Sequence, residues 1–312
     1  DQPRSRGLGD VYKRQLLGGS LVLILLLKTP LGMESGGNRA WLGVEGIPVS
    51  LQPAEIVKLT FILVLSKQLV WVKEHWGLRS LRSVAFLGGH LLLMMGLYYA
   101  ISSDMGSALV YAFVFAAMAF VAGVAARWFV IALLGGGAAF YLLWELDKIP
   151  DYMKERFMVV FDHSLDPLGA GWQQTRSLLA LGGGKLTGQG LFHGIQTQGE
   201  YSGSLPFRYT DFIFSVICEQ FGMLFGSCVL LMYVAIIWRG TSIAMAARTR
   251  FHGLLAMGCT AMIGLQTFII IGGVIKLIPL TGVTMPFVSY GGTSLVACLC
   301  LIGLIQGVSS VN

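Results

Sequence analysis

The chain contains eight apolar stretches, each about as long as a membrane-crossing helix. A helix needs roughly 20 apolar residues to cross the hydrocarbon core of a bilayer, and it satisfies its own backbone hydrogen bonds there. The pattern therefore predicts an all-α polytopic membrane protein with no separate soluble domain. The eight stretches are residues 16–33, 52–72, 83–102, 104–125, 128–146, 211–237, 254–275 and 286–308.

Composition agrees with this fold class. Hydrophobic residues make up 55% of the 312 residues and charged residues only 12%, whereas a soluble domain carries about a quarter. The net charge of +6 fits loops enriched in Lys and Arg on the cytoplasmic side, so we predict no nucleic-acid partner. The five cysteines lie in apolar stretches without metal-ligand or disulfide spacing, which favours a packing role.

Basic residues gather in alternate loops, which predicts the orientation in the membrane. These loops face the cytoplasm by the positive-inside rule. They are 73–82, the turn near 127 and 238–253, with Lys73, Arg79, Arg82, Arg127, Arg239, Arg248 and Arg250. The opposite side then holds 34–51, the turn 102–104, the long loop 147–210 and the turn 276–285.

Residues 1–15 differ from the rest of the chain. They are polar, rich in Arg and Gly, and lack the apolar core of a signal peptide. We expect a non-native, artefactual leader, with the membrane domain covering residues 16–312. A genuine cytoplasmic tail is the alternative.

The loop 147–210 is far longer than an ordinary connection, and loops of this kind are usually functional or disordered. Its aromatic residues predict that it is ordered. They are Trp172, Phe192, Tyr201 and Phe207. The glycine-rich stretch 181–190 within it is not a nucleotide-binding loop, because Lys185 is followed by Leu rather than by Ser or Thr.

Two groups of ionisable residues lie near the ends of apolar stretches, where such residues are functional candidates. Glu55 and Lys58 are three residues apart at the start of a predicted helix, so they share a face and can pair. Asp104 follows two serines and fits a helix N-cap. For both groups a purely structural role and a role in lining a cavity remain open.

Asp211 stands between the long loop and the apolar stretch 211–237. Thr210 could equally cap this helix, which would leave the Asp211 carboxylate one position inside, and at a helix N-terminus the dipole favours the ionised form. An ionised carboxylate there suits a general base or a cation ligand, and capping alone is the alternative. Glu219 lies eight residues later on the same face, as a second cavity residue or a partner for another helix.

The long loop also carries several cations. Beside a membrane cavity they could hold a phosphorylated lipid head group, and an ordinary solvated loop is the alternative. They are Lys154, Arg156, Arg176, Lys185 and Arg208.

Five segments of the chain, in order, resemble the SEDS family of membrane glycosyltransferases, the rod-shape, division and sporulation proteins that polymerise peptidoglycan. They are "NRAWLGVEGIPVSLQPAEIVKL" (38–59), "SSDMGSALV" (102–110), "DPLGAGWQQTRSLLALGGGKLTGQGLFHGIQTQ" (166–198), "YTDFIFSVICEQFG" (209–222) and "IGGVIKLIPLTGVTMPFVSYGGTSL" (271–295). The family has ten transmembrane helices, so the resemblance implies that this chain holds the third to the tenth, about eight, with one long extracellular loop.

The resemblance also implies roles for particular residues. Asp211 would be the catalytic aspartate. The residues expected to line or brace the cavity and bind substrate are Glu55, Lys58, Asp104, Arg39, Arg176, Lys185, Arg208 and Glu219. Two departures from the family pattern, Tyr209 in place of a common His and Gln189 in place of a common Lys, weaken the assignment of auxiliary contacts.

The implied activity is polymerisation of lipid II into glycan strands at the outer face of the bacterial cytoplasmic membrane. The implied partners are membrane lipids and a transpeptidase of the class B penicillin-binding type. A divalent cation, Mg²⁺ or Mn²⁺, is implied by the family alone, and its ligands are unknown. The alternatives are a lipid II flippase or transporter, and a noncatalytic scaffold for a transpeptidase.

Overall fold

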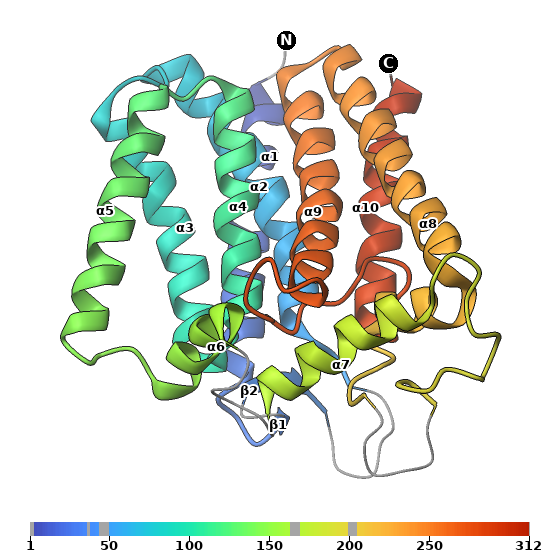
Figure 1. The fold of residues 1–312 in the computed structure, drawn as a ribbon. Helices are drawn as coiled ribbons and strands as arrows, with labels where there is room; N and C mark the ends of the chain where they lie inside the picture. The colour runs from blue at the N-terminus through green and yellow to red at the C-terminus, as the bar shows by residue number, and fades with distance from the viewer. Residues whose placement is uncertain (1–2, 36–37, 44–49, 163–168, 199–204, 312) are drawn as a thin grey trace. The chain divides into compact units, whose positions relative to one another are not determined.

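The computed structural model describes residues 3–35, 38–43, 50–162, 169–198 and 205–311. Within these residues the chain is helical apart from loops and one two-stranded hairpin (Figure 1), which confirms the predicted all-α class. The chain divides into two compact units. The first unit comprises 1–128, 238–263 and 292–312, and the second comprises 129–237 and 264–291.

The first unit is built around α2 (Pro53–His75). Pro53 starts this helix, where its missing N–H would have no partner in any case. Val57, Phe61 and Leu65 of α2 are at most 1% exposed, because other helices of the unit surround them. These are α1 (Pro3–Leu26), α3 (Leu81–Ser102), α4 (Met105–Ala122) and α10 (Gly292–Val311).

A hairpin of β1 (Gly32–Ser35) and β2 (Asn38–Leu42) follows α1. The expected span 16–33 is therefore wrong at its end, since the helix stops at Leu26 and the chain turns into β1. Residues 3–15, predicted to be a leader, are helical and continue without a break into the apolar part of α1, Arg14–Leu26. Their origin stays a prediction.

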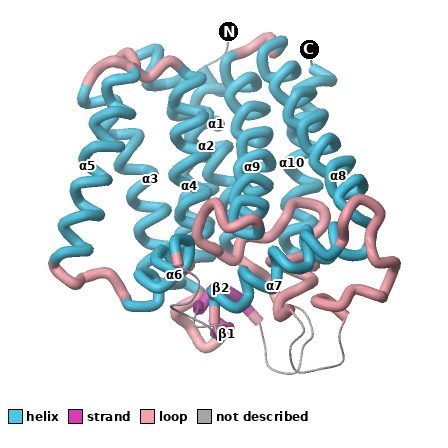
Figure 2. The backbone as a smooth tube through the Cα atoms, in the orientation of Figure 1, coloured by secondary structure: helices cyan, strands magenta, loops and turns pink. Residues whose placement is uncertain are grey.

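The second unit contains most of α5 (Ala126–Glu145), together with α6 (Asp151–Phe161) and α7 (Ala170–Gly183). It also holds the start of α8 (Ile213–Ala246) and the end of α9 (Arg250–Val274). Figure 2 shows loops between α7 and α8 and between α9 and α10. None of the α5 side chains is buried, so this apolar helix offers its surface to lipid.

Because α6 and α7 lie within the loop 147–210, the prediction of order is confirmed for its described residues. Tyr201 lies outside them. The helices supply this order, whereas Phe192 and Phe207 are 70% and 59% exposed and anchor no core.

Among the described residues, six helices are long and apolar enough to cross a membrane, namely α3, α4, α5, α8, α9 and α10. The α2 helix, with 23 residues, is longer than α4 but carries Glu55, Lys58 and Lys67, so the predicted count of eight spans stays a prediction. The predicted loop 238–253 is wrong, because α8 continues to Ala246 and only 247–249 separate it from α9. Residues 238–246 contain no proline and one glycine, so nothing stops the helix where the hydrocarbon core ends.

Candidate active site

Asp211 is carried by a tight turn at residues 206–212, directly before α8. The Phe207 carbonyl accepts hydrogen bonds from the backbone N–H groups of Thr210, Asp211 and Phe212 at 3.1, 3.1 and 3.2 Å. Phe207 has a left-handed φ of 51°, and Phe212 is completely buried. The carboxylate therefore projects, half-buried, from a turn whose backbone is fixed on both sides.

The predicted position of this carboxylate inside the first helical turn is wrong. The α8 helix begins at Ile213, two residues after Asp211. The Thr210 hydroxyl, expected to cap the helix, donates to the Phe207 carbonyl at 3.2 Å instead. Asp211 thus owes its place to the turn.

The loop between α9 and α10 is docked on this turn. The Tyr290 N–H donates to the Tyr209 carbonyl at 2.8 Å, and the Ser289 hydroxyl donates to the Thr210 carbonyl at 2.7 Å. These two bonds join the segment 286–290, "PFVSY", to the two residues that precede Asp211. Residues about eighty positions apart are thus locked together beside the acid.

The same loop places backbone next to the carboxylate. Gly282 has φ +72°, and a Cβ atom added there would lie 3.9 Å from Asp211 Oδ2. The loop is held in turn by α6, because Arg156 Nη1 donates to the Leu280 carbonyl at 3.3 Å. Arg156, predicted only as an outer-loop cation, therefore also fixes the loop that faces Asp211.

Two of the predicted cations converge on one short segment, residues 196–197. The guanidinium of Arg208 donates to the Thr197 carbonyl and lies 5.0 Å from the centre of the Tyr209 ring. Arg176, on α7, donates to Gln196 Oε1 at 2.7 Å. Both arginines are half-buried, and each has five N–H donors, so neither is saturated by these contacts.

Glu219 holds the same segment from the α8 side. Its Oε1 accepts from the Gln196 N–H at 2.7 Å, and its Oε2 accepts from the Thr197 N–H at 3.0 Å and from the Thr197 hydroxyl at 2.6 Å. The side chain is 0% exposed. Glu219 is therefore a buried anchor of the loop that carries the arginine contacts, and a direct part in substrate binding stays a prediction.

Lys185 lies in the glycine-rich stretch, which packs against a kink in α8 at Gly222 (φ 85°, ψ 168°). The kink frees the Met223 N–H, which donates to the Lys185 carbonyl at 2.8 Å, and the Gln189 N–H donates to the Glu219 carbonyl at 2.9 Å. Sequence reasoning missed this contact between the two segments. The Lys185 side chain itself is exposed.

The ionisable residues of the first unit are arranged as their structural interpretations predict. Lys58 Nζ donates to Glu55 Oε1 at 2.7 Å, and both side chains are buried. Asp104 caps α4 by accepting from the Ser107 N–H at 3.1 Å, and also accepts from the Tyr98 hydroxyl at 3.2 Å. The pairing and the capping are confirmed, while their roles in a substrate cavity stay predictions.

Arg39 lies on β2 and joins the hairpin to the chain that follows α1. Its Nη2 donates to the Thr29 carbonyl at 2.9 Å and its Nε to the Gly32 carbonyl at 3.3 Å. These bonds give it a structural part, and its predicted role in binding substrate stays a prediction.

Across the described residues, no group of three or more His, Cys, Asp and Glu side chains is placed to hold a metal ion. Asp211 therefore belongs to no such group among the described residues. Mg²⁺ is usually bound through one or two carboxylates together with substrate phosphates. A cation brought by a substrate diphosphate would fit this donor set, and the divalent cation itself stays a prediction.

Residues 10–312 match the family of cell cycle proteins represented by FtsW, RodA and SpoVE. The chain belongs to this family. Similar FtsW/RodA/SpoVE relatives include the stage V sporulation protein E of Bacillus subtilis, 36% identical over 92% of this chain and 76% of the relative. Another is the peptidoglycan glycosyltransferase MrdB of Escherichia coli K12, 32% identical over 92% of this chain and 75% of the relative.

Solved structures of the FtsW/RodA/SpoVE type have the same fold. A chain from a peptidoglycan synthase complex, studied for the coordination of polymerization and crosslinking, aligns with a TM-score of 0.76 at 29% identity over 94% of this chain and 79% of its own length. The rod shape determining protein RodA of Thermus thermophilus aligns with a TM-score of 0.65 at 29% identity, over 97% of this chain and 78% of its own.

Proposed function

We propose that this FtsW/RodA/SpoVE-type chain is a peptidoglycan glycosyltransferase that polymerises lipid II. The observation that carries the proposal is the Asp211 carboxylate, half-buried and fixed in a turn that the loop 275–291 locks in place. Nearby in the chain, Arg176 and Arg208 meet at the segment 196–197. A fixed acid accompanied by cations suits transfer of a sugar from a diphosphate carrier. Relatives named peptidoglycan glycosyltransferases, such as MrdB, support this reading.

The catalytic side faces outward in this proposal. The helix that follows Asp211 ends at a basic connection that carries Arg248 and leads directly into Arg250, the first residue of α9. Its part after the kink, Met223–Ala246, is about 36 Å long at 1.5 Å per residue, enough to cross the hydrocarbon core. The positive-inside rule assigns the basic end to the cytoplasm and the Asp211 end to the exterior.

Asp211 acts as the general base. A sugar hydroxyl is a weak nucleophile, so a positioned carboxylate must take its proton as it attacks. The acceptor 4-hydroxyl oxygen bonds to the donor anomeric carbon, the bond from that carbon to the diphosphate oxygen breaks, and the proton passes to Asp211. Attack opposite the leaving group inverts the anomeric centre.

The leaving undecaprenyl diphosphate departs as an anion, so it needs cations rather than an acid. Within the described part of the chain, Arg176 and Arg208 each have more N–H donors than their contacts use, so they can bind its oxygens, and the exposed Lys185 adds a further charge. A divalent cation bound to the diphosphate would add further charge neutralisation, with Asp211 as its one protein carboxylate.

We assign Glu55, Lys58 and Asp104 to the wall of the substrate cavity, and Arg39 and Glu219 to positioning of its loops. We propose a class B penicillin-binding transpeptidase as partner, in keeping with the synthase complex to which the fold is similar.

The test is the variant Asp211→Asn, assayed with purified lipid II for glycan strands and, in vesicles, for lipid II flipping. Loss of a general base lowers the rate by about 10²–10⁴-fold, while the melting temperature stays that of the unmodified chain. Asp151→Asn, which removes an exposed acid from the first turn of α6, is the matched control and keeps full activity. A fully active Asp211→Asn variant would contradict the assignment of Asp211 as the general base. If the unmodified chain flipped lipid II without any glycan synthesis, the transporter alternative would be favoured.

A further inference from the structure

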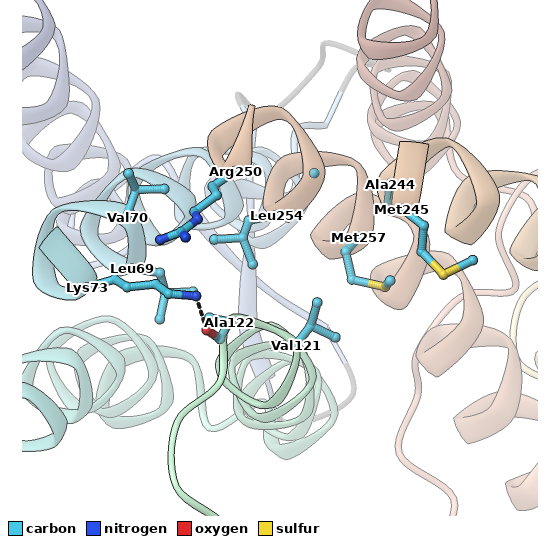
Figure 3. Close-up of a pocket in the computed structure, with 11 residues that line it drawn as sticks. Leu69, Val70, Lys73, Val121, Ala122, Ala244, Met245, Arg250, Leu254 and Met257 are labelled. Carbon is cyan, nitrogen blue, oxygen red and sulfur yellow. Dashed lines mark hydrogen bonds between the residues drawn. The ribbon is translucent and has the colours of Figure 1, made fainter. Parts of the chain in front are cut away.

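A cavity of about 190 Å³ lies in the first unit, at the ends of four helices far along the chain from Asp211. It is lined by the last turns of α2, α4 and α8 and by the first two turns of α9 (Figure 3). Most of its wall is apolar, and two cations stand at it. The residues that matter here are Leu69, Lys73, Val121, Arg250, Leu254 and Met257.

The two cations face the same space. Figure 3 shows the Lys73 ammonium beside the Ala122 carbonyl, to which it donates at 3.3 Å, and the Arg250 guanidinium extended toward α2. Of the described residues that line the cavity, none is acidic. Two positive charges thus stand over an apolar wall, and no described residue of that wall supplies a carboxylate to neutralise them.

A second cavity, of about 600 Å³, adjoins the first and shares Lys73 and Ala122 with it. It adds Trp76 and Arg79 to the lining. The guanidinium of Arg82 stacks 4.1 Å from the centre of the Trp76 ring. Trp with Lys and Arg at helix ends is typical of the level of the lipid head groups, so this end of the unit lies at the membrane–water interface.

We propose that these adjoining cavities bind an anionic phospholipid of the cytoplasmic leaflet. Its phosphate pairs with Lys73 and Arg250, and an acyl chain lies along Leu69, Leu254 and Met257. Basic pockets between transmembrane helices on the cytoplasmic side recognise anionic head groups in this way. A free phosphate would pair with the charges but leave the apolar wall uncovered, so the lipid is the better fit.

This lipid site goes beyond the glycan synthesis proposed above and is tested without it. Native mass spectrometry measures binding of dioleoyl phosphatidylglycerol and dioleoyl phosphatidylcholine to the purified full chain in detergent. Each charge near the surface contributes about fivefold to the binding of an anionic lipid. The double variant Lys73→Gln/Arg250→Gln should therefore bind phosphatidylglycerol roughly thirtyfold more weakly and phosphatidylcholine as before.

Three further measurements complete the test. Arg239→Gln removes an exposed charge of α8 that does not line the cavity and should change binding less than about twofold. Met257→Trp fills the apolar part and should weaken phosphatidylglycerol binding with both charges kept, which covers the case of a double variant that fails to fold. Glycerol 3-phosphate should not displace the lipid. Any of three results would overturn the proposal. They are a loss of phosphatidylglycerol binding in Arg239→Gln equal to that in the double variant, equal binding of the two lipids by the unmodified chain, and displacement of the lipid by glycerol 3-phosphate.

Discussion

Replacing Glu219 by Gln should loosen the segment 196–197 by a calculable amount. The carboxylate accepts three hydrogen bonds, two from backbone N–H groups and one from a hydroxyl, at 2.6–3.0 Å. A glutamine amide has only one acceptor oxygen, so at least one backbone N–H, at Gln196 or Thr197, loses its acceptor beside a fully buried side chain. One unpaired buried donor costs about 1–3 kcal/mol, and the change from charged to neutral acceptor adds about 1 kcal/mol.

The sum is about 2–4 kcal/mol, and each 1.4 kcal/mol is a factor of ten. Amide hydrogen exchange of the peptide covering 194–198 should therefore speed up by roughly 30- to 700-fold in Glu219→Gln, since local opening sets the exchange rate. Arg176 and Arg208 bond to the same segment, so glycan synthesis from lipid II should fall with it.

The control Glu155→Gln makes the same chemical change at an exposed position of α6 and should leave exchange at 194–198 and glycan synthesis unaltered. Exchange within twofold of the unmodified chain in Glu219→Gln would refute the reasoning, because the three hydrogen bonds would then not hold the loop.

Three other substitutions probe the fold. Gly222→Ala should lower the free energy of unfolding by about 3 kcal/mol or more, since the new Cβ would lie 2.2 Å from a carbonyl oxygen of the glycine-rich stretch. Thermal unfolding measures this, and Gly96→Ala, which has open space around its Cβ, is the control. Equal melting temperatures of the two variants would contradict the prediction. Glu55→Gln leaves the buried Lys58 unpaired and should lower the free energy of unfolding by about 3–5 kcal/mol, whereas Glu55→Gln/Lys58→Met should lower it by less. A larger loss in the double variant would show that the unpaired Lys58 charge is not the cause. A hydrogen bond from a lysine of α6 lowers the pKa of Asp147, so this pair stabilises the fold above the ordinary Asp pKa of about 4 and ceases to do so as the pH falls through the lowered value. Because Asp147 is exposed, Asp147→Asn should shift the melting temperature at pH 7 by less than about 2 °C. A larger shift would show that the pair contributes more stability than an exposed pair should.

The helices could be predicted from the sequence because bilayer crossing is a local property of composition and length. The errors lie where something other than hydropathy ends a helix. Residues 238–246 remain helical past the apolar stretch because no proline interrupts them. The α1 helix ends earlier than predicted because the chain turns into the hairpin 32–42. Hydropathy indicates where a helix can cross, while capping and tertiary contacts decide where it ends.

The candidate site was predicted in part. An acid next to an apolar stretch identified Asp211, and helical spacing gave the pair of Glu55 and Lys58. The turn that carries Asp211 was missed, because it depends on the left-handed Phe207 and on hydrogen bonds to Ser289 and its neighbour, which lie about eighty residues away. Sequence spacing carries no information on such contacts without a second sequence to compare.

The chemistry proposed for Asp211 gives a reason for placing it on a turn instead of a helix. A general base must be held in line with the hydroxyl it deprotonates, and a carboxylate inside the first turn of α8 would instead be drawn to the free N–H groups of that turn. In the observed turn, the Phe207 carbonyl takes up the N–H groups of Thr210, Asp211 and Phe212. The backbone N–H groups of the turn are thereby satisfied within the turn itself. The left-handed strain at Phe207 is then a condition of the site, and release of that turn should impair catalysis before it unfolds the helices.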